Sequence, residues 1–329
     1  MKEFLNRIKS LNVLVIGDVM LDRYMIGEVN RISPEAPVPV LAVKEEKSVA
    51  GGAANVALNI KSLGANVETI GWFGTDERGD ELVEILERKK IGVDPKFRFS
   101  SAPTISKTRV TSSNQQICRV DRESSPESYS SDSNEIRNEM IEKVRRSDAV
   151  IVSDYGKGFV TNQLLDLVRE NANFVSIDPK PSRQLKYTTP DLFTPNRFEA
   201  LELAGLSRDS CDPFPQEEVV SKIFERFAPK LLAVTLGSEG MLLAENGVIN
   251  KVIPTFAKEV FDVSGAGDTV IAALTLGLIG EQNFVHGKAE FVFMDERSGF
   301  VVQDEVLLER IHDSVLSLAA RLRKKIYTF

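Results

Sequence analysis

Glycine, aspartate and threonine stand together at residues 265–269, directly before a run of small apolar residues. The segment reads Gly265-Ala266-Gly267-Asp268-Thr269. Glycines at a helix start let backbone N–H groups converge on an anion, and the positive end of the helix dipole adds to the attraction. A carboxylate repels an anion there unless it handles a proton, so Asp268 is the candidate general base. The alternative is an ordinary glycine turn in which Asp268 caps the helix.

Two other phosphate-binding motifs are excluded by their spacing. No Lys-Ser or Lys-Thr pair follows the glycines, as a Walker-type loop requires, and the Gly-x-Gly-x-x-Gly of dinucleotide folds is absent. The chemistry that the segment favours is therefore transfer of, or binding to, an anionic group beside a base.

The composition limits the class of protein. The 329 residues carry a formal net charge of -7, with 42% hydrophobic and 27% charged residues, which is ordinary for a globular domain. An acidic chain lacks the positive charge that general nucleic-acid binding needs. Cys118 and Cys211 form no Cys-x-x-Cys or Cys/His cluster, so neither a disulfide framework nor a zinc site is predicted. No apolar run approaches the ~20 residues of a membrane span, and we expect a cytoplasmic protein.

Short apolar runs that end in polar or glycine residues recur along the chain. They occupy residues 13–19, 67–74, 149–154, 174–178, 192–196 and 231–236. Continuous runs of this length are typical of parallel strands buried on both faces. Ligands bind at the carboxyl ends of the strands in such sheets, so we expect these ends to line one crevice of a single domain spanning residues 1–329.

Polar residues from the first sixty positions are expected in that crevice. Asp18 and Asp22 follow the first run and suit the hydroxyl groups of a polyol, with a turn or cap role as the alternative. Gly51 and Gly52 open a small-residue helix and allow a ligand to approach the backbone closely. Asn55, one turn into that helix, is expected to face the same crevice.

Two segments depart from the main sheet. Residues 24–43 are strand-like but contain Pro-x-x-Pro-x-Pro, which a central strand cannot hold, and residues 104–120 alternate and are rich in Thr, Ser, Val and Arg. We expect both to form a small lid sheet, and a homodimer to form through it, because its apolar alternation and edges would otherwise be exposed. Arg109 and Arg119 are candidate anion contacts, and a solvated strand face is an equally good interpretation.

Taken together, these segments resemble the ribokinase-like (pfkB) carbohydrate kinases over nearly the full chain. Both halves of that family's signature are present in the expected order, as Gly51-Gly52-Ala53-Ala54-Asn55 running on to residues 71–79, and as Asp262-Val263-Ser264-Gly265-Ala266-Gly267-Asp268. Within the family, residues 17–22, 32–40 and 114–116 are similar to the D-glycero-D-manno-heptose 7-phosphate kinases of lipopolysaccharide core synthesis. The resemblance implies a ribokinase-like α/β fold, with a mostly parallel central sheet, flanking helices and a small β-sheet lid. It also implies transfer of the ATP γ-phosphoryl group to the anomeric hydroxyl, which gives the 1,7-bisphosphate.

The resemblance implies roles for individual residues. Asp268 becomes the base for the sugar hydroxyl, and the anion hole for the migrating phosphoryl group comes from Gly265, Ala266 and Gly267. The sugar hydroxyl groups are assigned to Asp18, Asp22, Gly51, Gly52 and Asn55. Asn196 and Glu199 match the family's Asn-x-x-Glu motif, which orders Mg²⁺ and its waters, and the nucleotide-binding turn is matched by Thr235, Gly237 and Gly240. Arg109 and Lys157 are our own candidates for the substrate's 7-phosphate.

The chain departs from the family after Gly280. The Gly-Thr turn that closes the adenine pocket and contributes to a monovalent-cation site is missing, and Asp295, Glu296 and Arg297 stand where small or amide residues are expected. We therefore predict weak nucleotide binding that depends only slightly on potassium. The His-x-Gly-His element of the nucleotidyltransferase domain fused to many of these kinases is also absent, so we expect the kinase to act alone.

Two other functions remain open. The chain could be a ribokinase-like kinase of another sugar or nucleoside, or a non-catalytic sugar or nucleotide sensor that keeps the fold. A pure binder has no need of a carboxylate in its anion hole, so Asp268 favours an enzyme.

Overall fold

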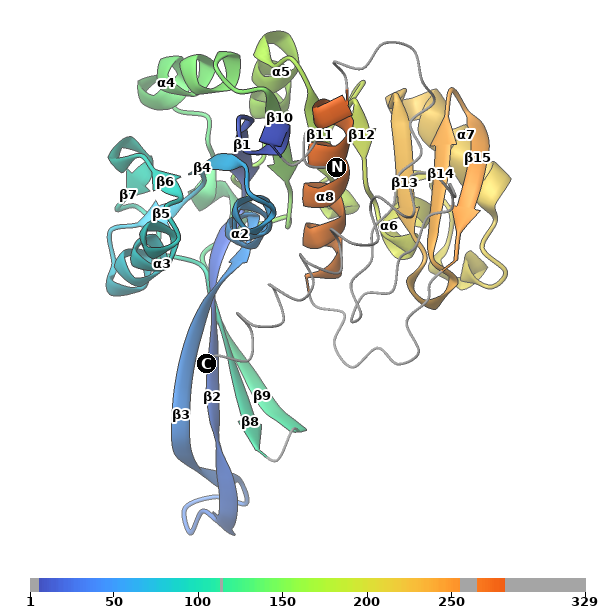
Figure 1. Ribbon diagram of the computed structural model, residues 1–329. Coiled ribbons are helices and arrows are strands. Elements are labelled where there is room, and N and C mark those ends of the chain that lie inside the picture. The colour runs from blue at the N-terminus through green and yellow to red at the C-terminus, as the bar shows by residue number, and fades with distance from the viewer. Residues whose placement is uncertain (1–5, 113–114, 255–264, 282–329) are drawn as a thin grey trace.

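A mostly parallel sheet forms the centre of the molecule, as Figure 1 shows for the computed structural model, which describes residues 6–112, 115–254 and 265–281. Nine strands lie in the order β15-β14-β13-β12-β11-β10-β1-β4-β6; the pairs β13-β14 and β14-β15 are antiparallel, and the other pairs of this sheet are parallel. The strands are β1 (Asn12–Gly17), β4 (Asn66–Ile70), β6 (Gly92–Val93), β10 (Ala149–Ser153), β11 (Val175–Asp178), β12 (Leu192–Phe193), β13 (Leu231–Thr235), β14 (Met241–Glu245) and β15 (Val248–Ile253). The expected parallel α/β sheet is confirmed.

Strand β1 shows why the apolar runs are continuous. Successive side chains of a strand point to opposite faces. Leu14 and Ile16 belong to one core cluster, whereas Val13 and Val15 belong to the cluster on the other face. All four are buried, so each face of the strand must be apolar.

Helices cover both faces of this sheet. The face that carries the site is covered by α2 (Ala53–Leu63), α3 (Glu77–Arg88) and α8 (Ala266–Glu281). The other face is covered by α4 (Asn134–Arg145), α5 (Asn162–Asn171), α6 (Arg197–Leu203) and α7 (Gln216–Phe227). Single 3₁₀ turns are η1 (Pro95–Phe97), η2 (Pro126–Tyr129), η3 (Pro181–Arg183), η4 (Arg208–Cys211) and η5 (Gly237–Glu239). None of the helices in the described ranges combines the length and apolar character needed to cross a bilayer.

A separate four-stranded sheet projects from the body as one long hairpin and one shorter hairpin (Figure 1). We call it the lid sheet; its strands, in the order β3-β2-β8-β9, are β2 (Val19–Ile32), β3 (Pro39–Gly52), β8 (Ser106–Ser112) and β9 (Gln115–Arg122). The two expected lid segments do pair, but β2 starts earlier and β3 ends later than the expected 24–43. Pro39 begins the edge strand β3, a place where a missing N–H costs little. A short pair, β5 (Phe73–Gly74) with β7 (Arg98–Phe99), lies apart from both sheets.

The lid sheet joins the main sheet without a linker. Asp18 is the single residue between β1 and β2, and β3 runs directly into α2. The backbone N–H of Ala53 donates to the Asp18 carbonyl at 3.0 Å, which closes the junction. Both strands of the hairpin therefore begin and end beside the carboxyl end of β1.

Candidate active site

Helix α8 begins at the candidate base, as expected from the sequence. Gly265 has a φ of 79°, and a Cβ built on it would lie 2.9 Å from the Asn55 side-chain nitrogen. Glycine is required there because a side chain would be strained and would also collide with its neighbour. Asp268, in the first turn of α8, is only 4% exposed. Gly265, Ala266 and Gly267 precede it at the helix start, where unbonded N–H groups are concentrated.

Both carboxylate oxygens of Asp268 accept hydrogen bonds from side chains. The Tyr155 hydroxyl, from the loop after β10, donates to Oδ1, and Asn55 Nδ2, from α2, donates to Oδ2 at 2.6 Å. Burial raises the pKa of Asp268, and these two donors partly offset the rise. A carboxylate with a raised pKa is better matched to proton abstraction near neutral pH than an ordinary aspartate.

The loop that carries Tyr155 is anchored by Asp18. Asp18 Oδ2 accepts the backbone N–H groups of Tyr155 at 2.8 Å and Lys157 at 3.0 Å, and Oδ1 accepts that of Phe159 at 2.9 Å. Asp18 is buried, with 1% of its surface exposed. We assigned Asp18 to sugar hydroxyl groups from the sequence, but its contacts are those of a residue that holds the 155–159 loop in place.

A second carboxyl group supports the same loop. Asp154 Oδ1 accepts the Gly156 N–H at 2.7 Å, and Oδ2 accepts the Tyr187 hydroxyl at 2.5 Å. Burial and the nearby Asp18 carboxylate raise the pKa of Asp154 to about 7. The sequence analysis placed Asp154 at a strand end but gave it no role.

Asp22 lies against Gly51, one of the two glycines before α2. Asp22 Oδ1 pairs with Arg109 Nη1 at 2.5 Å across the lid sheet. A Cβ on Gly51 would lie 2.3 Å from Asp22 Oδ2, so glycine is needed for the carboxylate to occupy this position. Gly52 is the N-cap residue of α2, the helix that presents Asn55.

The three cations predicted to contact an anion, of which Arg109 and Lys157 were assigned to the 7-phosphate, each pair with a carboxylate. Arg109 pairs with Asp22, as above. Arg119 pairs with Asp121 at 2.8 Å, and Lys157 Nζ pairs with Glu123 at 2.6 Å. Each candidate therefore already has a counterion, and an incoming phosphate must compete with it.

A fourth cation, Lys107 on β8, was missed by the sequence analysis. Strand register places it between Asp22 on β2 and Asp121 on β9, in the row next to Arg109 and Arg119. No ion pair joins Lys107 to another described residue within 4.0 Å. Burial, and after it the charge of Lys157, lower the pKa of Lys107.

The predicted nucleotide and metal residues lie at the carboxyl ends of the neighbouring strands. Asn196 and Glu199 form a reciprocal capping box at the start of α6, with Asn196 Oδ1 accepting the Glu199 N–H and Glu199 Oε2 accepting the Asn196 N–H, both at 3.0 Å. Lys180 Nζ donates to Glu199 Oε1 at 2.8 Å. Within the described residues no group of three or more His, Cys, Asp and Glu side chains is arranged to hold a metal ion by itself.

The predicted nucleotide turn lies beside these residues. Thr235 ends β13 and bridges to Asn196, Gly237 is the first residue of the turn η5, and Gly240 follows its last residue. A Cβ on Gly240 would lie 1.9 Å from the Ile253 carbonyl oxygen, so packing against β15 already requires this glycine. Asp178, at the end of β11, lies close to Gly267, and burial followed by the Glu199 and Asp268 charges raises its pKa. The strand ends of both halves therefore meet at α8.

Several predictions fall outside the described residues. These are the first part of the glycine segment, 261–264, the amide Asn114, and the altered C-terminal stretch with Asp295, Glu296 and Arg297. The predictions about the adenine pocket and potassium stay predictions.

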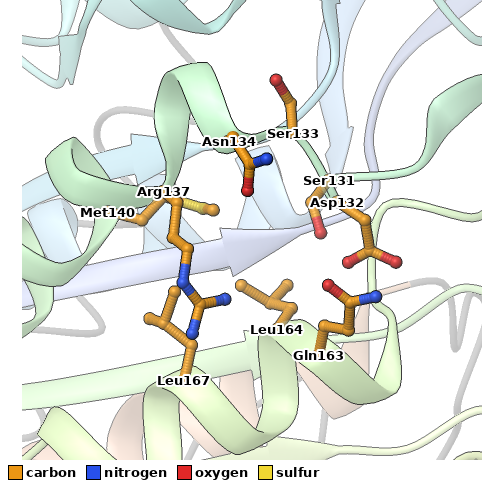
Figure 2. Close-up of a pocket in the computed structure, with 9 residues that line it drawn as sticks. All are labelled: Ser131, Asp132, Ser133, Asn134, Arg137, Met140, Gln163, Leu164 and Leu167. Carbon is orange, nitrogen blue, oxygen red and sulfur yellow. The ribbon is translucent and has the colours of Figure 1, made fainter.

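A small pocket elsewhere in the molecule is unrelated to this chemistry. Figure 2 shows it between α4 and α5, with Arg137, Gln163 and Leu164 among its lining residues. Its volume of about 20 Å³ has room for roughly one water molecule. The two helices belong to the core on the face opposite α8, so this pocket is not a substrate site for Asp268.

Comparisons with known proteins agree with this arrangement. The chain is 41% identical over 274 residues to the "Bifunctional protein HldE" of Helicobacter hepaticus, an alignment that covers 82% of this chain and 56% of that protein. It is 40% identical over 283 residues to the protein of the same name from Actinobacillus succinogenes, with 84% and 58% covered. The chain thus spans a little over half the length of these curated relatives.

The fold is that of ribokinase. The solved structure of Arabidopsis thaliana ribokinase complexed with ribose and ATP superposes with a TM-score of 0.61 over 82% of this chain and 86% of that one, at 22% identity. The profile of the pfkB family carbohydrate kinases matches residues 10–286, which include the glycine segment and Asp268. The chain is therefore a sugar kinase that belongs to the pfkB family of carbohydrate kinases.

Proposed function

We propose that this kinase phosphorylates the anomeric hydroxyl of D-glycero-D-manno-heptose 7-phosphate, giving the 1,7-bisphosphate for ADP-heptose and lipopolysaccharide core synthesis. Two findings support the heptose: relatives about 40% identical carry the name HldE, and residues 17–22, 32–40 and 114–116 resemble the heptose kinases. The proposal concerns the kinase reaction alone, because the chain spans only part of those relatives.

In the proposed reaction Asp268 is the base. It takes the proton of the anomeric hydroxyl while the sugar oxygen bonds to the γ-phosphorus. The bond from that phosphorus to the bridging oxygen breaks, and ADP leaves. The N–H groups of Gly265, Ala266 and Gly267 stabilise the charge of the migrating group.

The role of Asp268 is tested by Asp268→Asn. Turnover should fall ~10²–10⁴-fold, as is typical when a general base is lost, while calorimetry still detects sugar phosphate binding. The asparagine keeps the size of the side chain and can still meet Asn55 or Tyr155. Near-normal turnover would remove Asp268 from the mechanism.

ATP and Mg²⁺ are the proposed cofactors. Mg²⁺ prefers oxygen ligands, keeps several waters and is commonly held by nucleotide phosphates with one or two carboxylates. The residues fit such an ion only through water, because both Glu199 oxygens already accept hydrogen bonds, from Lys180 and from the Asn196 backbone. Bound magnesium would neutralise charge on the phosphates. Thr235, Gly237 and Gly240 are proposed to contact the nucleotide.

The environment of Lys107 is the observation that best supports the proposal of a phosphorylated substrate. The neighbouring cations Arg109, Arg119 and Lys157 have carboxylate partners, whereas among the described residues Lys107 has none within ion-pair distance. Lys107 shares a face of the lid sheet with Asp22, its directly paired neighbour on β2. Asp22 in turn acts on the pKa of Asp268. A phosphate at Lys107 would therefore lie on the same side of the lid as the base.

The substrate is tested with a panel of sugar phosphates and their unphosphorylated counterparts, measured as ATP-dependent ADP release with Mg²⁺. We expect the heptose 7-phosphate to have the highest kcat/KM. Lys107→Met should raise KM for it at least tenfold and leave the unphosphorylated sugar unaffected. Lys47→Met, at an exposed position of β3, is the control and should change neither. Preference for another sugar or a nucleoside would replace the heptose proposal, and equal KM changes in both variants would exclude Lys107 from phosphate binding.

A homodimer through the lid sheet is also proposed. Of nine large apolar side chains exposed in the described part of the chain, six lie on the lid strands or the turn between β2 and β3: Ile26, Ile32, Val38, Val43, Ile117 and Val120. Such a concentration on one thin sheet is costly unless another surface covers it. Sedimentation at micromolar concentration should give a dimer, and Val38→Lys with Val120→Lys should give a monomer. A monomeric wild-type protein would refute the proposal.

A further inference from the structure

We propose that Tyr155 is a positioning residue for Asp268, holding the carboxylate through its hydroxyl at the end of a loop that Asp18 clamps. The inference rests on the proposed role of Asp268 as base and extends it to a residue of the 155–159 loop. It gives a reason for the hydrogen bonds that two buried carboxyl groups, Asp18 and Asp154, accept from the backbone of this loop.

The loop has little freedom. Four hydrogen bonds to buried carboxyl groups hold its backbone: Asp18 accepts the N–H groups of Tyr155, Lys157 and Phe159, and Asp154 accepts that of Gly156. The Tyr155 ring therefore leaves a fixed backbone, and its hydroxyl reaches Asp268 Oδ1 from a fixed direction.

The Asp268 carboxylate is held from two sides. Tyr155 donates to Oδ1 from the loop after β10, and Asn55 donates to Oδ2 from α2. With one donor on each oxygen the carboxylate cannot rotate freely, yet each oxygen keeps a lone pair for a substrate hydroxyl. Positioning a catalytic group in this way lowers the entropic cost of reaching the reactive geometry.

The Tyr155 hydroxyl also favours the ionised form of Asp268, whose surroundings otherwise oppose a negative charge. The other titratable groups that act on Asp268 are Asp22 on the lid strand β2 and Asp178 at the end of β11. Both are carboxyl groups, and burial also opposes a negative charge on Asp268. The two donors, Tyr155 and Asn55, are the described contacts that favour the ionised base.

The test is Tyr155→Phe, with Tyr129→Phe as the matched control. Phenylalanine keeps the ring and removes only the hydroxyl. Tyr129 is a buried tyrosine whose hydroxyl contacts the Pro103 carbonyl and the Ser124 N–H, away from Asp268. For the best sugar phosphate of the panel, we expect Tyr155→Phe to lower kcat tenfold or more at pH 6.5 with KM nearly unchanged. The acid limb of its kcat profile should move upward by about one pH unit, so that part of the loss is recovered at pH 8.5.

A direct titration separates this inference from the identity of the substrate. The carboxyl ¹³C resonance of Asp268, assigned by its loss in Asp268→Asn, should titrate at a higher pH in Tyr155→Phe than in wild type and in Tyr129→Phe. Equal titration in the three proteins, with an unmoved acid limb, would overturn the proposal and leave Tyr155 a packing residue. A panel without any turnover would refute the proposed kinase substrate, while the titration would still decide the role of Tyr155.

Discussion

The buried Asp154 should make the protein less stable as the pH rises through neutrality. Its residue is 3% exposed, and its folded-state pKa is about 7 against a usual value of 3.8. The folded state therefore binds this proton more tightly than the unfolded chain does, so the stabilisation from protonation is present at low pH and is lost as the pH rises to about 7. A difference of about three units is worth about 4 kcal/mol, and about 2–3 kcal/mol of it falls between pH 5 and pH 8.

Asp154→Asn should remove this dependence. The amide oxygen can accept the Gly156 N–H as the carboxylate does, and the amide nitrogen can donate to the Tyr187 hydroxyl. That hydroxyl can in turn donate to the Lys180 carbonyl, which lies 3.0 Å away. No charge then has to be buried at high pH, so the variant should match or exceed wild type at pH 8 and lose that advantage at pH 5.

The assay is chemical denaturation of wild type, Asp154→Asn and the control Asp166→Asn at pH 5, 6.5 and 8. The Asp166 side chain is 59% exposed on α5, so its change should leave the pH dependence as in wild type. The quantity compared is the change in unfolding free energy between pH 5 and pH 8. Parallel curves for wild type and Asp154→Asn would refute the assignment of the raised pKa to Asp154.

Three further outcomes are expected. Chelation of Mg²⁺ should abolish turnover without lowering the melting temperature, and turnover in metal-free buffer would contradict the proposed cofactor. Lys143→Met should destabilise the fold by about 1–3 kcal/mol in denaturation, because it removes the ion-pair partner of Asp94, 3.1 Å from Nζ, and one of the two cationic partners of Glu68, 2.9 Å from Nζ. Gly51→Ala should raise KM for the sugar phosphate several-fold by displacing Asp22, with little change in kcat, and unchanged kinetics would show that the Asp22 position is unimportant.

The sequence could predict that residues far apart in the chain lie together in the candidate site, because this follows from the topology of the sheet. Asn55 and Asp268 are 213 positions apart, yet they share a hydrogen bond. Apolar runs indicated parallel strands, and the carboxyl ends of parallel strands lie at one edge of their sheet. The positions of Asp22, Gly51 and the glycine segment before α8 follow from the same argument.

The partners of individual charges could not be predicted, because they depend on strand register. Arg109 meets Asp22 only because β8 pairs with β2 in one particular alignment, and the same alignment leaves Lys107 without an ion pair in the described chain. Tyr155 gave no signal either, since a tyrosine after a strand is as often a packing residue. The capping box of Asn196 and Glu199 was not predicted, although Asn-x-x-Glu is also the spacing of such a box.

A single residue, Asp18, joins β1 to β2, so the lid sheet is connected to the main sheet without a flexible linker. A tilt of β2 acts directly on Asp18, whose carboxylate holds the loop that carries Tyr155. A tilt of β3 acts through Gly52 on α2, the helix that carries Asn55. The two donors to the base are thus connected to the two strands of one hairpin, which Figure 1 shows projecting from the body. Any movement of the lid sheet would therefore act on both donors to the base at once.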